Sequence, residues 1–183
     1  MLNNKQKFFL IFILGLIIGA LAIVLFISYT SYSSQIFAPV SAFAFFSPEN
    51  GKELLSFIDS AKQSIDVEIY VFTSDDALQA LKRASDRGVA IRVIIEKRVS
   101  NDDNWKIFND LKVYGIKVKW ASIDYALTHA KFVIVDGKRV LVGSHNFSQH
   151  AMYKNREAGV ILTGEKIAND FQQVFEEDWI KAN

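Results

Sequence analysis

The stretch THAKFVIVDGKRVLVGSHNFS, residues Thr128–Ser148, sets the architecture that the rest of the chain has to complete. It holds two apolar runs separated by little more than Asp136-Gly137, and Asp-Gly between apolar runs is a strong signal for a β-hairpin. We expect one strand over Thr128–Val135 and a returning strand over Arg139–Gly143. A hairpin needs further strands to bury its apolar side chains, so the remaining sequence should supply a sheet.

The hairpin carries a cluster of polar groups. Side chains alternate between faces along a strand, so His129 and Lys131 point the same way, about 7 Å apart along the backbone. Ser144 and Asn146, after the returning strand, also share a face, and the hairpin can bring them beside the first pair. An imidazole can attack phosphorus or relay a proton, and an ammonium with amide and hydroxyl donors can neutralise phosphate oxygens. The cluster therefore predicts chemistry on a phosphate ester.

The chain outside the hairpin alternates strands and helices. Period-two patterns predict strands, and apolar residues at helical spacing predict helices. This alternation implies right-handed crossovers and an α/β fold with a mixed, largely parallel sheet flanked by helices. The predicted strands are Ala42–Phe46, Ile65–Phe72, Val89–Glu96, Ile116–Trp120 and Arg156–Leu162. The predicted helices are Pro48–Gln63 with Ser47 as N-cap, a helix from Asp75 that stops at Gly88, Asn101–Tyr114 and Glu165–Lys181.

An apolar segment precedes the folded part. Phe8–Ile27 contains only apolar residues and glycine, and at about 1.5 Å per residue it can cross a ~30 Å hydrocarbon core as a transmembrane helix. Lys5 and Lys7 precede it, so the positive-inside rule places the N-terminus in the cytoplasm and the domain on the extracytoplasmic side. A cleaved signal peptide, leaving a periplasmic or secreted domain, is the alternative. The predicted parts are an anchor or uncleaved signal over 1–28, a linker over 29–41 and a folded domain over 42–183.

Charge and cysteine content narrow the function classes. The chain has no cysteine, which excludes thiol catalysis and cysteine-based zinc sites. When Lys5 and Lys7 are left out, 19 of the 21 Lys and Arg residues remain, compared with 20 Asp and Glu residues. The domain is therefore near-neutral, and any attraction to phosphate must be local rather than a global basic field.

The polar residues of the hairpin follow the pattern His-x-Lys-x4-Asp and then Gly-Ser-x-Asn. In this pattern the chain resembles the phospholipase D superfamily, and the resemblance extends over Ala42–Asn183. It includes Ile65–Thr73, Arg87–Val89 and Asp178-Trp179. The short form with a single motif is similar to the metal-independent bacterial endonucleases of the group and to the membrane-anchored mitochondrial cardiolipin hydrolase. The motif residues are His129, Lys131, Asp136, Gly143, Ser144 and Asn146.

The resemblance implies a mechanism. His129 of one subunit would attack the phosphodiester to form a phosphohistidine, and His129 of a second subunit would protonate the leaving group and then activate water. Lys131 and Asn146 of both subunits would hold the phosphate, with Ser144 in support. Glu157 matches the acidic residue that orients the histidine and supports a transient imidazolium. No metal or cofactor is implied, and a symmetric homodimer follows, because the family builds each site from two motifs.

Other motif positions receive structural or open assignments. Asp136 stands at the hairpin end, too far along the strand to touch phosphate readily, so we expect it to hold the loop. Gly143 belongs to the same structural part of the motif. His145 departs from the family's pattern, in which a non-ionisable residue is more usual. We expect it to be either a surface residue or a second group that faces the ligand.

Three functions remain open. Nucleic acid, DNA or RNA, is the leading substrate because the short single-motif form most resembles the endonucleases. A phospholipid hydrolase of the cardiolipin type is the alternative, since a membrane tether makes lipid accessible. A nucleic-acid-binding module without turnover is the second alternative, and the intact His129, Lys131 and Asn146 argue against it.

Other charged residues show less specific patterns. The three histidines, which include His150, could supply imidazoles for zinc, but the ammonium of Lys131 beside His129 would repel a cation. Asp66 and Glu68 share one face of a strand, where acids are usually solvent-facing or structural. Two basic clusters could contact nucleic acid, although solvated faces are the more common explanation. These clusters are Lys97-Arg98 and Lys112, Lys117 and Lys119.

Overall fold

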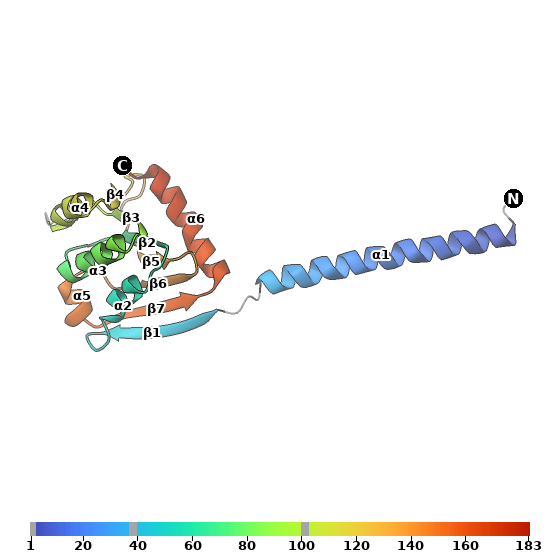
Figure 1. The fold of residues 1–183 in the computed structure, drawn as a ribbon, viewed down its shortest axis with the longest axis horizontal. Coiled ribbons are helices and arrows are strands. Elements are labelled where there is room, and N and C mark those ends of the chain that lie inside the picture. The colour runs from blue at the N-terminus through green and yellow to red at the C-terminus, as the bar shows by residue number, and fades with distance from the viewer. Residues whose placement is uncertain (1–2, 37–39, 100–102) are drawn as a thin grey trace. The chain divides into compact units, whose positions relative to one another are not determined.

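The structure, a computed structural model, describes residues 3–36, 40–99 and 103–183. The chain divides into two compact units, Met1–Pro39 and Val40–Asn183. The described part of the first unit is one helix, α1 (Asn4–Ile36) (Figure 1). Its segment Asn4–Thr30 is long and apolar enough to cross a membrane by length and composition.

Helix α1 continues through residues 29–36, where the sequence analysis expects a linker. Ser28–Ile36 contains no proline or glycine that would end the helix. The Thr30 hydroxyl bonds back to the helix backbone, since it donates to the Ile27 carbonyl at 3.0 Å. Residues 37–39 of the expected linker lie outside the described residues.

The second unit is a seven-stranded sheet with helices on both faces, in the strand order β1-β7-β6-β5-β2-β3-β4. The predicted α/β class with a mixed sheet flanked by helices is confirmed, and the short helix α5 is an element that the sequence analysis does not predict. The strands are β1 (Ser41–Ser47), β2 (Ser64–Ile69), β3 (Ala90–Ile95), β4 (Lys117–Trp120), β5 (Lys131–Val135), β6 (Arg139–Gly143) and β7 (Glu157–Thr163). The helices are α2 (Glu53–Asp59), α3 (Asp75–Asp86), α4 (Asp103–Val113), α5 (Gln149–Tyr153) and α6 (Glu165–Lys181).

The strand directions correct one part of the prediction, because the sheet is not largely parallel. Among the described residues, β2, β3 and β4 pair in parallel, and the other four of the six pairings are antiparallel. The alternation of strand and helix accounts for the parallel part alone. The hairpin reverses the chain between β5 and β6, and β1 adds to the edge of the sheet antiparallel to β7.

Each face of the sheet has its own apolar core. Helices α2, α3, α4 and α5 cover one face, and α6 covers the other (Figure 1). On β2, Ile65, Val67 and Ile69 are buried in the first core, as the predicted alternation requires. Asp66 and Glu68 of the same strand point toward α6 and are buried at 6% and 2% exposure rather than facing solvent.

The helix predicted over Pro48–Gln63 is shorter than expected, because Ser47 belongs to β1. Ser47 pairs with Glu157 in the sheet, and its buried hydroxyl donates to the Ala151 carbonyl at 2.6 Å. The hydroxyl is therefore engaged elsewhere and does not cap a helix. Helix α2 begins only at Glu53.

The sheet register gathers the motif residues at one end of the sheet, which we call the motif end. Lys131 begins β5, Gly143 ends β6 and Glu157 begins β7. Lys131 also pairs with Ile69, the last residue of β2, so the carboxyl ends of the parallel strands lie at this end too.

The chain enters the domain at the other end, which we call the turn end. There Ser41, the first residue of β1, pairs with Thr163, and Thr163 pairs with Arg139 beside the hairpin turn at Asp136-Gly137. Strand β1 then runs toward the motif end. The entry point and the motif residues are therefore separated by the length of the sheet.

Candidate active site

His129 and Lys131 are in contact at the motif end. Strand β5 begins at Lys131, so His129 precedes the strand instead of lying on it as predicted. The Lys131 Nζ nevertheless lies 3.3 Å from each ring nitrogen of His129 and donates a hydrogen bond to the His129 carbonyl at 2.8 Å. The imidazole is exposed. An exposed imidazole beside an ammonium is well placed to meet an anionic substrate.

Tyr70, which follows β2, contacts both of these side chains. The centroids of the Tyr70 and His129 rings are 4.5 Å apart. The Lys131 ammonium lies 5.2 Å from the centroid of the Tyr70 ring. Burial lowers the pKa of Lys131 below its ordinary value, and the charge of Glu157 only partly opposes this. A partly desolvated ammonium interacts more strongly with an anion than a fully hydrated one does.

Strands β6 and β7 approach closely at Gly143, and this approach positions Ser144. A Cβ at Gly143 would lie 2.3 Å from the Ala158 carbonyl oxygen, so no larger residue fits there. The Ser144 hydroxyl accepts a hydrogen bond from the Ala158 N–H at 3.1 Å and donates one to the Glu157 carboxylate. The structure thus brings Ser144 and Glu157 together, as an exposed pair at the motif end.

The Glu157 carboxylate bonds to groups other than His129. Its Oε2 accepts from Ser144, and its Oε1 accepts from the Asn155 Nδ2 at 3.0 Å. Burial raises the pKa of Glu157, but the two hydrogen bonds and nearby cations outweigh burial and lower the pKa below its ordinary value. Within one chain, and among the described residues, Glu157 does not bond to the His129 ring, so the predicted orienting contact is absent there.

Asn146 follows β6 and is tied to the chain after β2. Its Oδ1 accepts a hydrogen bond from the Val71 N–H at 3.3 Å, and the next residue, Phe147, donates its own N–H to the Val71 carbonyl at 3.0 Å. These bonds fix the carboxamide by its oxygen. The Nδ2 group has no partner among the described residues, so donors remain for an anion.

Asp136 lies at the turn end, at the opposite end of β5 from Lys131. Its Oδ1 accepts from the backbone N–H groups of Lys62, Gln63 and Ser64 at 3.1, 2.7 and 3.1 Å. Burial raises the pKa of Asp136, but these backbone donors outweigh burial and lower the pKa. The carboxylate thus joins the hairpin turn to the loop before β2.

His145 is not a surface residue, and it packs against β1 instead of facing open space. It is 2% exposed, its ring stacks on Phe45 with centroids 4.8 Å apart, and its Nε2 lies 3.2 Å from the Ser47 hydroxyl. Burial lowers the pKa of His145. Both expectations for this residue are therefore wrong. In the described part of the chain, no group of three His, Cys, Asp or Glu residues is placed to hold a metal ion.

Two members of the basic clusters are engaged within the fold. Arg98 forms an ion pair at 2.7 Å with Glu96, which is completely buried. The Lys119 Nζ donates to the carbonyls of Trp179 and Ala182, at the end of α6, at 2.8 and 2.9 Å. These two side chains are thus parts of the fold and not free contacts for nucleic acid. The sequence does not mark Glu96, because no local pattern identifies a glutamate whose partner, Thr128, is distant in the chain.

Comparison with known proteins assigns the family. Residues 54–179 match a family model described as cardiolipin synthase, PLD-like domain, and this match covers more than half of the chain. The chain therefore belongs to the phospholipase D family.

Individual relatives agree with this assignment. A phospholipase D family member, Nuc from Salmonella typhimurium, has a solved structure that matches with a TM-score of 0.75 and 32% identity, covering 79% of this chain and 97% of that one. The mitochondrial cardiolipin hydrolase of Chlamydomonas reinhardtii is 28% identical over 72% of this chain and 58% of its own length. The phospholipase D of Rickettsia conorii is 28% identical over 70% of this chain and 64% of its own length. The chain thus spans less than two thirds of the length of the cardiolipin hydrolase and of the Rickettsia phospholipase D.

Proposed function

We propose that this chain is a metal-independent phosphodiesterase in which His129 is the nucleophile. The observation that carries the proposal is the contact of the exposed His129 imidazole with Lys131 at the motif end. Ser144 and Glu157 lie bonded to each other at the same end. The relatives named as a cardiolipin hydrolase and a phospholipase D support a phosphodiester substrate.

The reaction runs in two steps in this proposal. A ring nitrogen of His129 forms a bond to phosphorus while the bond to the leaving oxygen breaks, and that oxygen takes a proton from His129 of a second subunit. Water then forms a bond to phosphorus as the phosphorus–nitrogen bond breaks, and the second histidine takes a proton from the water. Both imidazoles return to their starting protonation states.

Three side chains stabilise the phosphate in this proposal. The Lys131 ammonium is partly buried, which strengthens its attraction to the charge that builds up on the non-bridging oxygens. The bond from the Val71 N–H occupies the Asn146 oxygen and leaves the Nδ2 donors for the phosphate. Ser144 supports the site through Glu157, whose carboxylate also balances the charge of Lys131.

A second copy of the chain completes the site. Each chain has one motif, whereas the mechanism needs two histidines in one site. We therefore propose a homodimer in which two motif ends face each other across a two-fold axis. Light scattering on the full chain in detergent micelles tests this. A monomer with full activity would contradict it.

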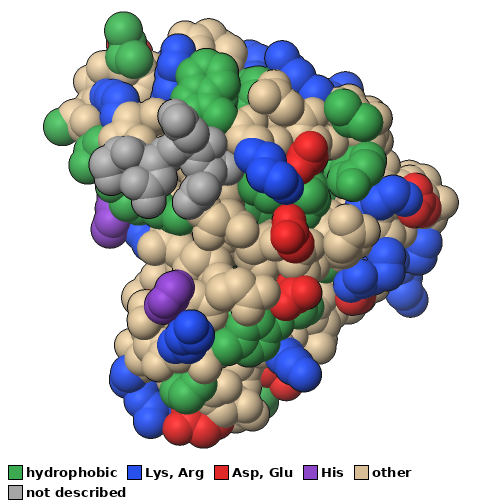
Figure 2. Space-filling view, turned by 90° about the vertical axis from the view of Figure 1, so that its left-hand side faces the viewer, with side chains coloured by type: hydrophobic (Ala, Val, Ile, Leu, Met, Phe, Trp, Pro, Cys, Tyr) green, Lys and Arg blue, Asp and Glu red, His purple; other side chains and the backbone are tan. Residues whose placement is uncertain are grey.

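Nucleic acid, DNA or RNA, is the substrate that we propose. The short form with a single motif resembles the metal-independent bacterial endonucleases, and this resemblance favours nucleic acid. On the face drawn in Figure 2, basic and acidic side chains are interspersed, so attraction to phosphate depends on local groups and not on a broad basic field.

A phospholipid of the cardiolipin type is the second candidate substrate. Ile123 and Leu127, which shortly precede His129, are exposed at 76% and 44%. Exposed apolar side chains beside a site favour an apolar partner such as lipid. Nucleic-acid binding without turnover is the third candidate.

Helix α1 is, in this proposal, a single-pass anchor. Lys5 and Lys7 favour an N-terminus in the cytoplasm and a domain on the extracytoplasmic side. A cleaved segment with a periplasmic or secreted domain remains the alternative. Alkaline extraction of membranes distinguishes the two, because only a retained anchor leaves the domain bound to the membrane.

A substrate panel in EDTA tests the function. The full chain in detergent micelles is given plasmid DNA, single-stranded DNA, RNA and cardiolipin-containing micelles. We expect cleavage of nucleic acid in EDTA, and we expect His129→Asn to lose this activity with an unchanged unfolding midpoint, because His129 is exposed. Cleavage of lipid alone would select the second candidate, and binding without cleavage would select the third. Full activity in His129→Asn would exclude the mechanism.

A further inference from the structure

The segment that leads into His129 has no regular structure of its own. Residues 121–130 connect β4 to β5 without a helix or a strand. Ile123 in this segment is 76% exposed, whereas Ser122 and Thr128 near its ends are buried at 7% and 8%. Such a segment lacks a ladder of backbone hydrogen bonds, so other groups must hold its course.

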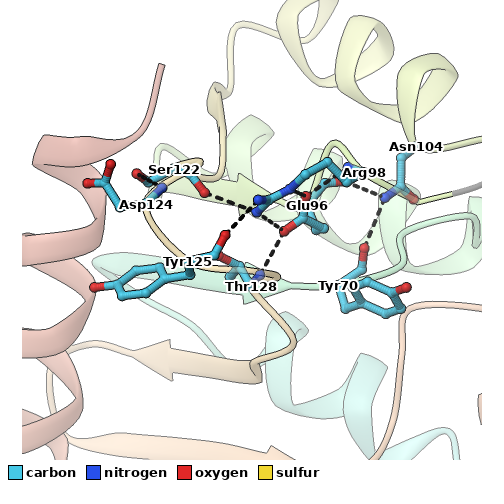
Figure 3. Close-up of polar contacts among 8 residues, drawn as sticks. All are labelled: Tyr70, Glu96, Arg98, Asn104, Ser122, Asp124, Tyr125 and Thr128. Atoms are coloured by element: carbon cyan, nitrogen blue, oxygen red, sulfur yellow. Dashed lines mark hydrogen bonds and ion pairs between the residues drawn. The ribbon is translucent and has the colours of Figure 1, made fainter.

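Glu96 holds the end of this segment next to His129 (Figure 3). Its carboxylate follows β3 and is 0% exposed, and its Oε2 accepts a hydrogen bond from the Thr128 N–H at 2.7 Å. Arg98 occupies the remaining acceptor positions, through its backbone N–H and Nε at 2.7 Å and through its Nη2 at 2.8 Å. Burial raises the pKa of Glu96, but these donors outweigh burial and lower the pKa, so the carboxylate remains charged at neutral pH.

Arg98 holds the rest of the segment. Its Nη1 donates to the Tyr125 carbonyl at 2.6 Å, and its Nη2 donates to the Ser122 carbonyl at 3.1 Å (Figure 3). The planar guanidinium therefore reaches two carbonyls and one carboxylate at once. A lysine ammonium is a single point charge and cannot make all of these bonds.

Asn104 links Tyr70, whose ring contacts the His129 imidazole, to the backbone of Glu96. Its Nδ2 donates to the carbonyls of Tyr70 and Glu96 at 3.0 and 2.9 Å (Figure 3). The Tyr70 ring contacts the His129 ring. The backbone before His129 and the aromatic ring beside it are thus both connected to Glu96.

We propose that Glu96 and Arg98 are positioning residues that set the place of the His129 imidazole during the reaction. This inference rests on the proposed function of His129. Thr128 is adjacent to His129 in the chain, so releasing its N–H from Glu96 moves the imidazole directly. A misplacement of about 1 Å can reduce a rate about 10²-fold. An ion pair with a purely structural role would change stability without changing the rate of the folded protein.

The test compares Arg98→Lys with the matched control Arg92→Lys. Arg92 also bridges two carboxylates, Asp66 at 2.7 Å and Glu176 at 2.6 Å, and its side chain is 25% exposed against 31% for Arg98. Among the described residues, Arg92 makes no bond to residues 121–130. The two variants therefore make the same chemical change at arginines of similar exposure, and only one of these arginines holds the segment before His129.

The full chain in detergent micelles is measured in EDTA on the substrate that the wild type cleaves. We expect Arg98→Lys to lower kcat at least about tenfold with KM within about twofold, because binding groups remain while the nucleophile is displaced. We also expect faster hydrogen exchange at the Thr128 amide. Arg92→Lys should keep both kcat and the Thr128 exchange rate.

The outcomes separate this inference from the proposed function. If the wild type is active, His129→Asn is inactive and Arg98→Lys keeps the wild-type kcat, the inference is overturned and the function stands. Equal loss of kcat in both lysine variants, in proportion to their loss of folded protein, also overturns it. If His129→Asn remains active, the proposed function fails, and the positioning role fails with it.

Discussion

The two ends of the sheet are both held by a carboxylate, but the two carboxylates act differently. At the turn end, and among the described residues, Asp136 accepts hydrogen bonds only from backbone N–H groups, those of residues 62–64. At the motif end, Glu96 accepts the backbone N–H groups of Thr128 and Arg98 and two further bonds from the Arg98 guanidinium. The first arrangement closes a turn. The second holds an irregular segment whose next residue is the exposed His129.

Two buried glutamates, Glu68 on β2 and Glu96 directly after β3, extend this comparison. Glu96 and Glu68 are 0% and 2% exposed, yet their pKa values shift in opposite directions. Donors from Arg98 and Thr128 lower the pKa of Glu96 in spite of burial. Burial and the charge of Asp178 raise the pKa of Glu68 to about 8, and its Oε2 has no partner among the described residues. Hydrogen-bond donors, more than burial, thus decide which carboxylate stays charged.

The largest effect is expected from Lys131→Met at the motif end. Removing the ammonium leaves the charge on the phosphate oxygens unopposed, and we expect kcat/KM to fall about 10³-fold, or about 4 kcal/mol. The unfolding midpoint should not fall, because a partly buried charge is replaced by an apolar chain. Steady-state kinetics in EDTA checks the rate. The matched control is Lys138→Met at the exposed turn end, and a similar loss there would mean that the effect is not specific to the motif end.

The next largest effect is expected on the pH dependence of stability, which Glu68→Gln should change. The unfolded carboxyl titrates near 4.5 and the folded one near 8, so the folded protein binds more protons between these values. The contribution of Glu68 to the free energy of unfolding is therefore fully present below pH 4.5. It falls as the pH rises toward 8, by about 3 kcal/mol between pH 5 and pH 8. Glu68→Gln should remove this slope, because an amide mimics the protonated acid. Urea unfolding at pH 5 and pH 8 measures it, and an unchanged slope in the variant would rule out Glu68 as its source.

Asp136→Ala should destabilise the turn end by about 2 kcal/mol, because three backbone N–H groups lose their acceptor and a non-glycine residue keeps a φ of 56°. Asp136→Asn retains one acceptor oxygen and tolerates this φ, so about 1 kcal/mol is expected. Urea unfolding gives both values. The kcat of the folded protein should stay at the wild-type level, and a large loss of kcat in Asp136→Asn would show that the turn end contributes to the reaction.

The smallest effect is expected from Ser144→Ala. The change removes one hydrogen bond to Glu157 at the motif end and leaves Lys131 in place, so we expect about a tenfold loss of kcat, or about 1.4 kcal/mol. Kinetics on the wild-type substrate measures the loss. Thr163→Val removes a hydroxyl at the turn end and serves as the control, with kcat unchanged.

Local patterns account for the parts that the sequence predicts. The hairpin turn, β6 (Arg139–Gly143) and α6 (Glu165–Lys181) lie where the sequence places them, because the Asp-Gly turn and the apolar spacing are encoded within a few residues. The contact of His129 with Lys131 also follows from their spacing, although His129 lies just before its strand.

Contacts between distant residues account for the parts that the sequence does not predict. Serine often caps a helix, but Ser47 belongs to β1, where it pairs with Glu157. His145 is buried because β1, about a hundred residues earlier, brings Phe45 against it. The bond from Thr128 to Glu96 likewise joins residues that no local pattern relates. Which strand lies at an edge, and in which direction it runs, is decided by such contacts.

The most direct test of the account is a search for the covalent intermediate on His129. The full chain is mixed with its substrate in EDTA, stopped at early times in alkaline denaturant, which preserves a phosphorus–nitrogen bond, and mapped by mass spectrometry. The account predicts a phosphoryl adduct on His129 that is absent from His129→Asn. Turnover with an adduct on another residue, or turnover that persists in His129→Asn, would contradict it.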